Sequence, residues 1–179
     1  MRIVALIFMT LTFIIGGAIS VALYKLIDNR LGTDDPQAKE QLYSHLKTAE
    51  VAIEQLKKEG IDVTKIDDAE IQQSLEIIES TPPIWKVEFA GKLGMLSALL
   101  AVAMVFTAFT KKRSVKFLSI AVIASAVLVW FSTPDIAPGL MSGINPKTAS
   151  LVAMIALTIS AVCAFASYNL HLKKVNQTA

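Results

Sequence analysis

The residues best placed for chemistry are four charged side chains at or near the ends of apolar segments: Glu88, Lys92, Asp135 and Lys147. Glu88 and Lys92 are four residues apart with the acid first, the spacing at which an ion pair forms on one helix face. Ionisable groups at a membrane are candidates for substrate or partner contacts, but shallow ones also anchor helices at the interface. We therefore predict a polar rim at one end of the molecule rather than a buried site.

Signatures of catalysis or of cofactor binding do not occur in the chain. The single cysteine, Cys163, excludes an internal disulfide and a cysteine-based zinc site. The two histidines, His45 and His171, are predicted on opposite sides of the membrane and so cannot share a metal ion or a haem. No nucleophile elbow, P-loop, HExxH or dinucleotide motif is present. We predict no catalytic residue, metal or cofactor, although an acid and a base at the rim leave a lipid-modifying or quinone-linked enzyme open as an alternative.

Membrane-spanning helices must position these residues, because the composition is that of an integral membrane protein. Of the 179 residues 54% are hydrophobic and 18% are charged, and the mean hydropathy is +0.55. Crossing roughly 30 Å of hydrocarbon takes about 20 helical residues. Four apolar runs approach or exceed this length, and we predict spans over residues 3–24, 87–110, 117–132 and 148–170. The first is interpreted as an uncleaved anchor, because it is longer than the apolar region of a signal peptide.

The distribution of charge predicts the orientation of these spans. The first two residues, the loop 111–116 and the tail 171–179 together carry seven basic residues and no acidic one. The segment 25–86 carries 8 basic and 13 acidic residues, and it is expected on the other side together with the short loop 133–147. Basic residues favour the cytoplasmic side, so both termini are predicted to be cytoplasmic. We expect a bacterial inner membrane with residues 25–86 in the periplasm.

The acidic segment 25–86 is predicted to form a helical hairpin, with a charged linker as the alternative. Asp35 followed by Pro36 is a helix start, and Gly60 is a stop, which gives a first helix over about 36–59. Asp67 begins a second helix over about 67–80. Each helix carries an apolar stripe, too small to form a stable core alone, so we expect the stripes to pack on each other and on the bundle's outer face, another copy of the chain or a different protein. The stripe contains Leu42, Leu46, Ile53 and Leu56 in the first helix and Ile71, Leu75 and Ile78 in the second.

Small residues recur at four-residue spacing within the spans and predict close helix packing. They are Gly16, Ser20, Gly94, Ala98, Ser125, Ala156, Ser160 and Ala164. The middle of each span is free of charge, which lowers the expectation of an ion-coupled transporter.

The sequence predicts an all-α integral membrane protein with a four-helix bundle. We expect a non-catalytic accessory or scaffold subunit that docks in a larger membrane complex through its helices and the periplasmic hairpin. Its expected partners are the lipid bilayer and either a different protein subunit or further copies of itself, and the acidic balance argues against nucleic acid. The alternative is a small transporter or an oligomeric channel with the polar rim at its outer mouth.

Overall fold

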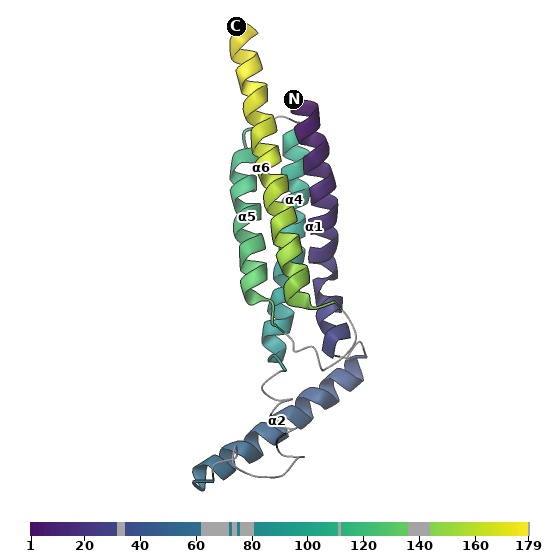
Figure 1. The fold of residues 1–179 in the computed structure, drawn as a ribbon, viewed down its shortest axis with the longest axis vertical. Coiled ribbons are helices and arrows are strands. Elements are labelled where there is room, and N and C mark those ends of the chain that lie inside the picture. Colours follow the sequence, from purple (N-terminus) through teal and green to yellow (C-terminus); the bar gives the residue numbers. More distant parts are fainter. Residues whose placement is uncertain are drawn as a thin grey trace.

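The described part of the chain folds into a bundle of four long helices with a further helix beyond one end of the bundle (Figure 1). A computed structural model describes residues 1–31, 35–61, 72, 75, 81–110, 112–135 and 144–178. Within these ranges the secondary structure is helical and includes no strand. The helices are α1 (Arg2–Leu31), α2 (Pro36–Lys58), α4 (Ile84–Phe109), α5 (Val115–Ser132) and α6 (Pro146–Thr178).

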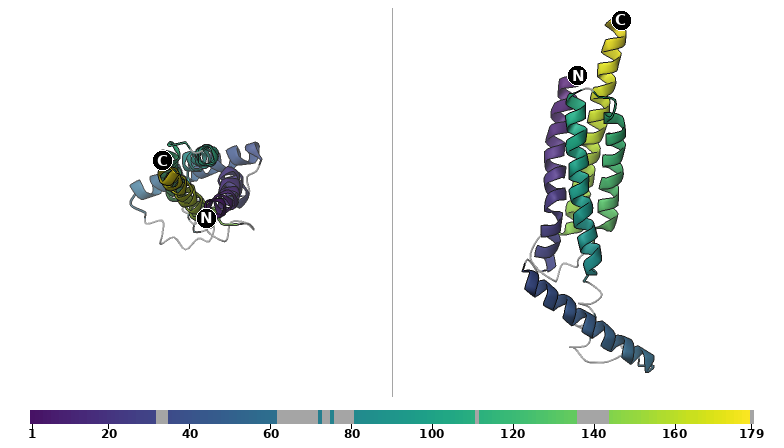
Figure 2. Two further views of the ribbon diagram at one scale, coloured as in Figure 1. Left: turned by 90° about the horizontal axis from the view of Figure 1, so that it is seen from above. Right: turned by 180° about the vertical axis from the view of Figure 1, so that it is seen from behind.

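The four bundle helices pack as a closed ring in which neighbours run in opposite directions. α1 packs against α6 and α4, and α5 packs against the same two helices from the other side. Figure 2 shows the ring from its end and from behind. The two termini lie at one end of the bundle, and α2 lies at the other end (Figure 1).

Four helices are long and apolar enough to cross a membrane, as predicted from the sequence: α1, α4, α5 and α6. α1 and α6 continue beyond the predicted span ends at residues 24 and 170. The added turns of α1 include Ile27, which is fully buried together with Val87 and Ala90 of α4. The charge at Lys25 ends the apolar run, but the helix continues because it still packs on its neighbour.

α2 begins where the sequence predicted a helix start. The side chain of Asp35 accepts a hydrogen bond from the backbone N–H of Gln37 at 3.0 Å, and Pro36 occupies the first turn. After Lys58 the chain turns at Gly60, whose φ of +80° is a conformation that side chains disfavour. The predicted second helix over 67–80 lies outside the described residues except for Gln72 and Leu75, which are both helical.

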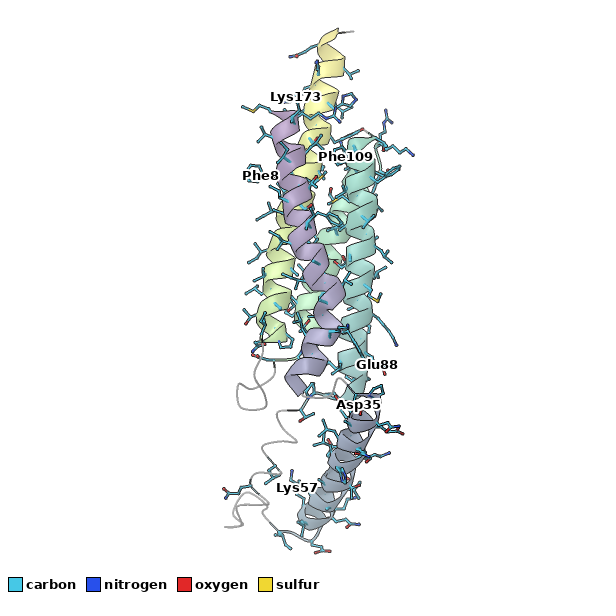
Figure 3. All side chains as sticks on the ribbon, turned by 90° about the vertical axis from the view of Figure 1, so that its right-hand side faces the viewer. Phe8, Asp35, Lys57, Glu88, Phe109 and Lys173 are labelled. Carbon is cyan, nitrogen blue, oxygen red and sulfur yellow. The ribbon has the colours of Figure 1, made fainter. Side chains whose placement is uncertain are left out.

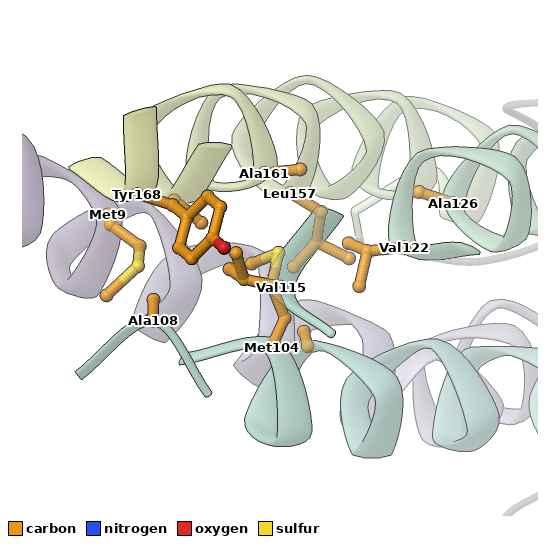
Figure 4. Close-up of a cluster of buried hydrophobic side chains, with 11 residues drawn as sticks. Met9, Met104, Ala108, Val115, Val122, Ala126, Leu157, Ala161 and Tyr168 are labelled. Carbon is orange, nitrogen blue, oxygen red and sulfur yellow. The ribbon is translucent and has the colours of Figure 1, made fainter. Parts of the chain in front are cut away.

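The bundle encloses two groups of buried apolar side chains. The larger one lies toward the termini and is shown in Figure 4, where Met9, Met104, Leu157 and Tyr168 pack together. The smaller one lies nearer α2 and includes Leu23 of α1 and Val129 of α5. The outward faces are apolar as well: Phe117 is 78% exposed and Leu99 is 67% exposed. A bundle that is apolar on both its inner and outer faces is suited to lipid rather than water.

Two glycines allow backbones to approach closely within the bundle. A Cβ atom added to Gly94 of α4 would lie 2.5 Å from the carbonyl oxygen of Ser20 in α1. A Cβ atom added to Gly16 of α1 would lie 2.8 Å from the side chain of Leu157 and 3.1 Å from the carbonyl oxygen of Ala153 in α6. Both helices that flank α1 therefore contact it at positions where only glycine fits without movement.

Buried hydroxyl groups add hydrogen bonds between helices. Ser125 of α5 lies 3.1 Å from the hydroxyl of Ser97 in α4, and Ser160 of α6 donates to the carbonyl oxygen of Met9 in α1 at 2.9 Å. By double-mutant cycles, such bonds between membrane helices contribute about 0.6 kcal/mol on average. They thus support the packing of small residues without replacing it.

The contact at Gly94 predicts a stability difference between two glycine-to-alanine changes. Gly94→Ala forces the α1 backbone to move and should lower the free energy of unfolding by about 1–3 kcal/mol, the usual cost of overpacking. Gly17→Ala is the matched control, because its added methyl meets only the mobile ring of Phe13 at 3.3 Å. Reversible denaturation in mixed detergent micelles measures both changes, and equal stability of the two variants would contradict the proposed contact.

Candidate functional site

Glu88 and Lys92 form an ion pair on the surface of α4. Lys92 Nζ lies 3.3 Å from Glu88 Oε2, at the predicted spacing of four residues. The side chain of Lys92 is 77% exposed and that of Glu88 is 47% exposed. Figure 3 shows Glu88 at the end of α4 that lies near Asp35 and the start of α2, while Phe8, Phe109 and Lys173 lie toward the opposite end. An exposed pair of this kind contributes little to stability, so its charges remain available to other groups.

Lys147 binds the end of α5. Its Nζ donates to the carbonyl oxygens of Trp130 at 2.6 Å and of Thr133 at 3.1 Å, and it lies 4.9 Å from the centre of the Trp130 ring. The last carbonyls of a helix have no partner within the helix, and the negative end of the helix dipole attracts a cation. Lys147 thus connects α6 to the end of α5.

The beginning of α6 is fixed from the same place. The Asn145 side chain accepts a hydrogen bond from the backbone N–H of Lys147 at 2.8 Å and donates to Asp135 Oδ1 at 3.0 Å. Asp135, Asn145 and Lys147 together join the two ends of the connection between α5 and α6. Their contacts are those of a structural link.

The four predicted rim residues therefore form two separate groups. Glu88 and Lys92 lie on α4, beside a groove that this helix forms with α1. Asp135 and Lys147 lie where α5 meets α6. Among the described residues, neither an ion pair nor a hydrogen bond joins the two groups.

The predicted apolar stripe of α2 is half-buried along the described helix. Leu42, Leu46, Ile53 and Leu56 are all partly covered. Of the three stripe residues predicted for a second helix, Leu75 is half-buried, while Ile71 and Ile78 lie outside the described residues. The hydroxyl of Tyr43 donates to the carbonyl oxygen of Pro82 at 3.1 Å, which ties α2 to the chain just before α4.

A groove with a volume of about 1080 Å³ runs between α1 and α4. Small residues, among them Gly17, Ala18 and Gly91, line part of it. Sequence reasoning missed this groove. The small residues of α1 and α4 were the available signal, but their spacing alone predicts only packing. Its lining residues are Phe13, Ile14, Gly17, Ala18, Val21, Ala22, Tyr24, Lys25, Glu88, Gly91, Lys92, Met95, Ala98 and Val102.

A second cleft, with a volume of about 540 Å³, lies where α2 passes the end of this groove. Glu40, Ser44 and Lys47 of α2 line one side of it. Tyr24 of α1 and Glu88 of α4 line both the cleft and the groove, so the two spaces are adjacent.

The small residues predicted to pack helices are buried in the bundle. All eight lie inside it: Gly16, Ser20, Gly94, Ala98, Ser125, Ala156, Ser160 and Ala164.

Ligands for a metal are not gathered anywhere in the described ranges, because no three His, Cys, Asp or Glu side chains lie together there. His45 is exposed on α2, and Cys163 is half-buried on α6.

Comparisons with known protein families, with curated proteins and with solved structures each found no match to this chain.

The two polar groups predict different effects of removing a lysine. Lys147→Met leaves two carbonyl oxygens of α5 without their charged donor and should lower the free energy of unfolding by about 1–2 kcal/mol. Lys92→Met removes only an exposed pair within one helix and should cost at most about 0.5 kcal/mol. Denaturation of both variants in the same micelles measures the difference, and an equal or larger loss for Lys92→Met would show that the assignment is wrong.

Proposed function

We propose that the protein is a non-catalytic accessory or scaffold subunit of a larger membrane complex and that α2 is its principal contact surface. The observation that carries this proposal is the position of α2. This 23-residue amphipathic helix lies beyond the end of the bundle and is anchored mainly near its first turns (Figure 1).

The direction of the apolar stripe supports a contact with another protein. Glu40, Ser44 and Lys47 face the cleft beside the bundle. Leu42 and Leu46 lie about 100–160° around the helix from these three residues. The stripe therefore lies on a different face of α2 from the cleft, and its half-buried side chains leave apolar area that a partner or a second copy of the chain can cover.

The interior of the bundle supports a scaffold rather than a catalyst. Its described core is formed by apolar side chains and a few serine hydroxyls, and the charged residues described within the four helices lie near their ends. Chemistry at mid-depth in a membrane usually requires an ionisable group there. A scaffold that contacts other proteins does not need an ionisable group at mid-depth.

The alternative of a small transporter or oligomeric channel is less well supported. The proposed outer mouth requires Glu88, Lys92, Asp135 and Lys147 to share a rim, whereas the described contacts divide them between two positions on the bundle. The centre of the bundle is occupied by Met104, Leu157 and their neighbours. A pore would therefore have to form between copies of the chain.

We place the protein in a bacterial inner membrane with α2 in the periplasm. The bundle end that bears the termini carries Lys112, Arg113 and Lys116 near the junction of α4 and α5, and Lys173 and Lys174 of α6, and basic residues favour the cytoplasmic side. The acidic segment 25–86 then lies outside, in agreement with the position of α2 at the opposite end.

The docking role predicts that charges in the stripe release the protein from its complex. Leu46→Glu combined with Ile53→Glu should shift the full-length chain, at native expression, from a high-mass band to its own mass on native gels. Glu50→Gln combined with Glu54→Gln, on the exposed face of α2, is the matched control and should leave the high-mass band unchanged. A wild-type chain that migrates alone, without a partner or a second copy, would rule out the proposal.

The orientation predicts which positions react with a thiol reagent that does not cross membranes. In a Cys163→Ala background, Glu50→Cys on α2 should be labelled in cells whose inner membrane is intact. Lys173→Cys on α6 should be labelled only after the membrane is permeabilised. The reverse pattern would place α2 in the cytoplasm.

A further inference from the structure

We propose that the groove between α1 and α4 and the adjoining cleft under α2 bind one anionic glycerophospholipid, of the phosphatidylglycerol class. Its acyl chains would lie in the groove and its head would lie at Lys25 and Lys92. This inference does not depend on the proposed docking role, because the cleft and the apolar stripe lie on different faces of α2.

The length and polarity of the groove match one leaflet of a bilayer. Lys92 and Val102 are ten residues apart on α4, which is about 15 Å along the helix axis. Half of the roughly 30 Å hydrocarbon layer is the same length. The groove is apolar from Phe13 and Val102 as far as Val21, and its charges are confined to the end beside α2. A phospholipid has the same order of apolar tails and charged head.

The charges at this end favour an anionic head. Lys25 and Lys92 against Glu88 leave the mouth of the groove with one net positive charge. Glu88 already pairs with Lys92, whereas Lys25 on the opposite wall forms no ion pair with the described residues. A phosphate group between the two helices would lie between these lysines, and lysines at a membrane surface attract anionic lipid heads.

The cleft under α2 suits the remainder of a glycerol head. Lys47 adds a further positive charge, and Glu40 and Ser44 provide oxygen atoms that can accept hydrogen bonds from glycerol hydroxyls. With the cleft included, the combined lining has three lysines (Lys25, Lys47 and Lys92) and two glutamates (Glu40 and Glu88), so its net charge remains +1.

The position of α2 disfavours a partner helix as the occupant. α2 passes the charged end of the groove and bounds the cleft there. A helix with its side chains is about 10–12 Å in diameter, and a straight helix that followed the groove out of the membrane would meet α2. A lipid would not meet this obstacle, because its flexible acyl chains and small head would terminate at that point.

The test is native mass spectrometry of the full-length chain in detergent. The protein is titrated with phosphatidylglycerol or with phosphatidylcholine of the same acyl chains. We expect one phosphatidylglycerol to bind in preference to phosphatidylcholine. Lys25→Ala and Lys92→Ala should each weaken this binding about 5-fold. Lys25→Arg should preserve it, and Lys112→Ala at the opposite end should have no effect.

Two further variants separate binding from damage to the fold. Glu88→Gln removes the competing carboxylate and should strengthen binding, a change that a misfolded protein would not show. Val21→Trp fills the groove from a lipid-exposed position and should abolish the preference, while Val162→Trp on the outer face of α6 is the matched control.

The proposal is overturned if the two lipids bind equally or if Val21→Trp binds phosphatidylglycerol as the wild type does. It is also overturned if a photo-crosslinker at Met95 in native membranes joins the groove to a second copy or to another protein rather than to lipid. Failure of the stripe variants to disrupt a complex would contradict only the docking role.

Discussion

The close approach of α1 to its two neighbours is the constraint on which the rest of the structure depends. Inside a membrane the hydrophobic effect does not drive helices together, because lipid tails are as apolar as the side chains. Stability must then come from dispersion contacts and a few hydrogen bonds, and both increase as backbones come closer. Gly94 against Ser20 and Gly16 against Leu157 provide such contacts on the two sides of α1. The hydrogen bond from Ser160 of α6 to the carbonyl oxygen of Met9 in α1 can form because these two helices lie close together.

The same contact gives the groove its shape. Where α1 and α4 meet through small residues, larger side chains beside the contact stand on either side of it. Gly17, Ala18 and Gly91 line the groove together with Val21 and Met95. The tight interface between α1 and α4 and the groove on its outer side are two consequences of one pattern of small residues. This explains how a bundle with a buried apolar interior can also carry a large groove on its exterior.

The sequence was sufficient for features set by local composition and insufficient for features set by how helices meet. Four spans follow from apolar runs, and the start of α2 follows from Asp35 and Pro36. The role of Lys147 could not be read in this way, because its acceptors belong to α5, fourteen and seventeen residues earlier in the chain. The extra turns of α1 depend on burial of Ile27 against α4. The groove could not be predicted, because its shape depends on the crossing angle and the register of α1 and α4. The four-residue spacing of small residues specifies neither.

The end of the bundle beside α2 is where the two proposed roles meet, and α2 keeps them apart. Its polar residues Glu40, Ser44 and Lys47 line the cleft, and Leu42 and Leu46 lie about 100–160° away around the helix. A lipid head on one face therefore leaves the other face free for a protein. Asp35 fixes the first turn of α2, and Tyr43 ties its second turn to Pro82. A contact helix fixed near one end can hold a partner at a set height above the membrane, provided that the space beneath it is filled. An anionic lipid head would fill that space from the membrane itself.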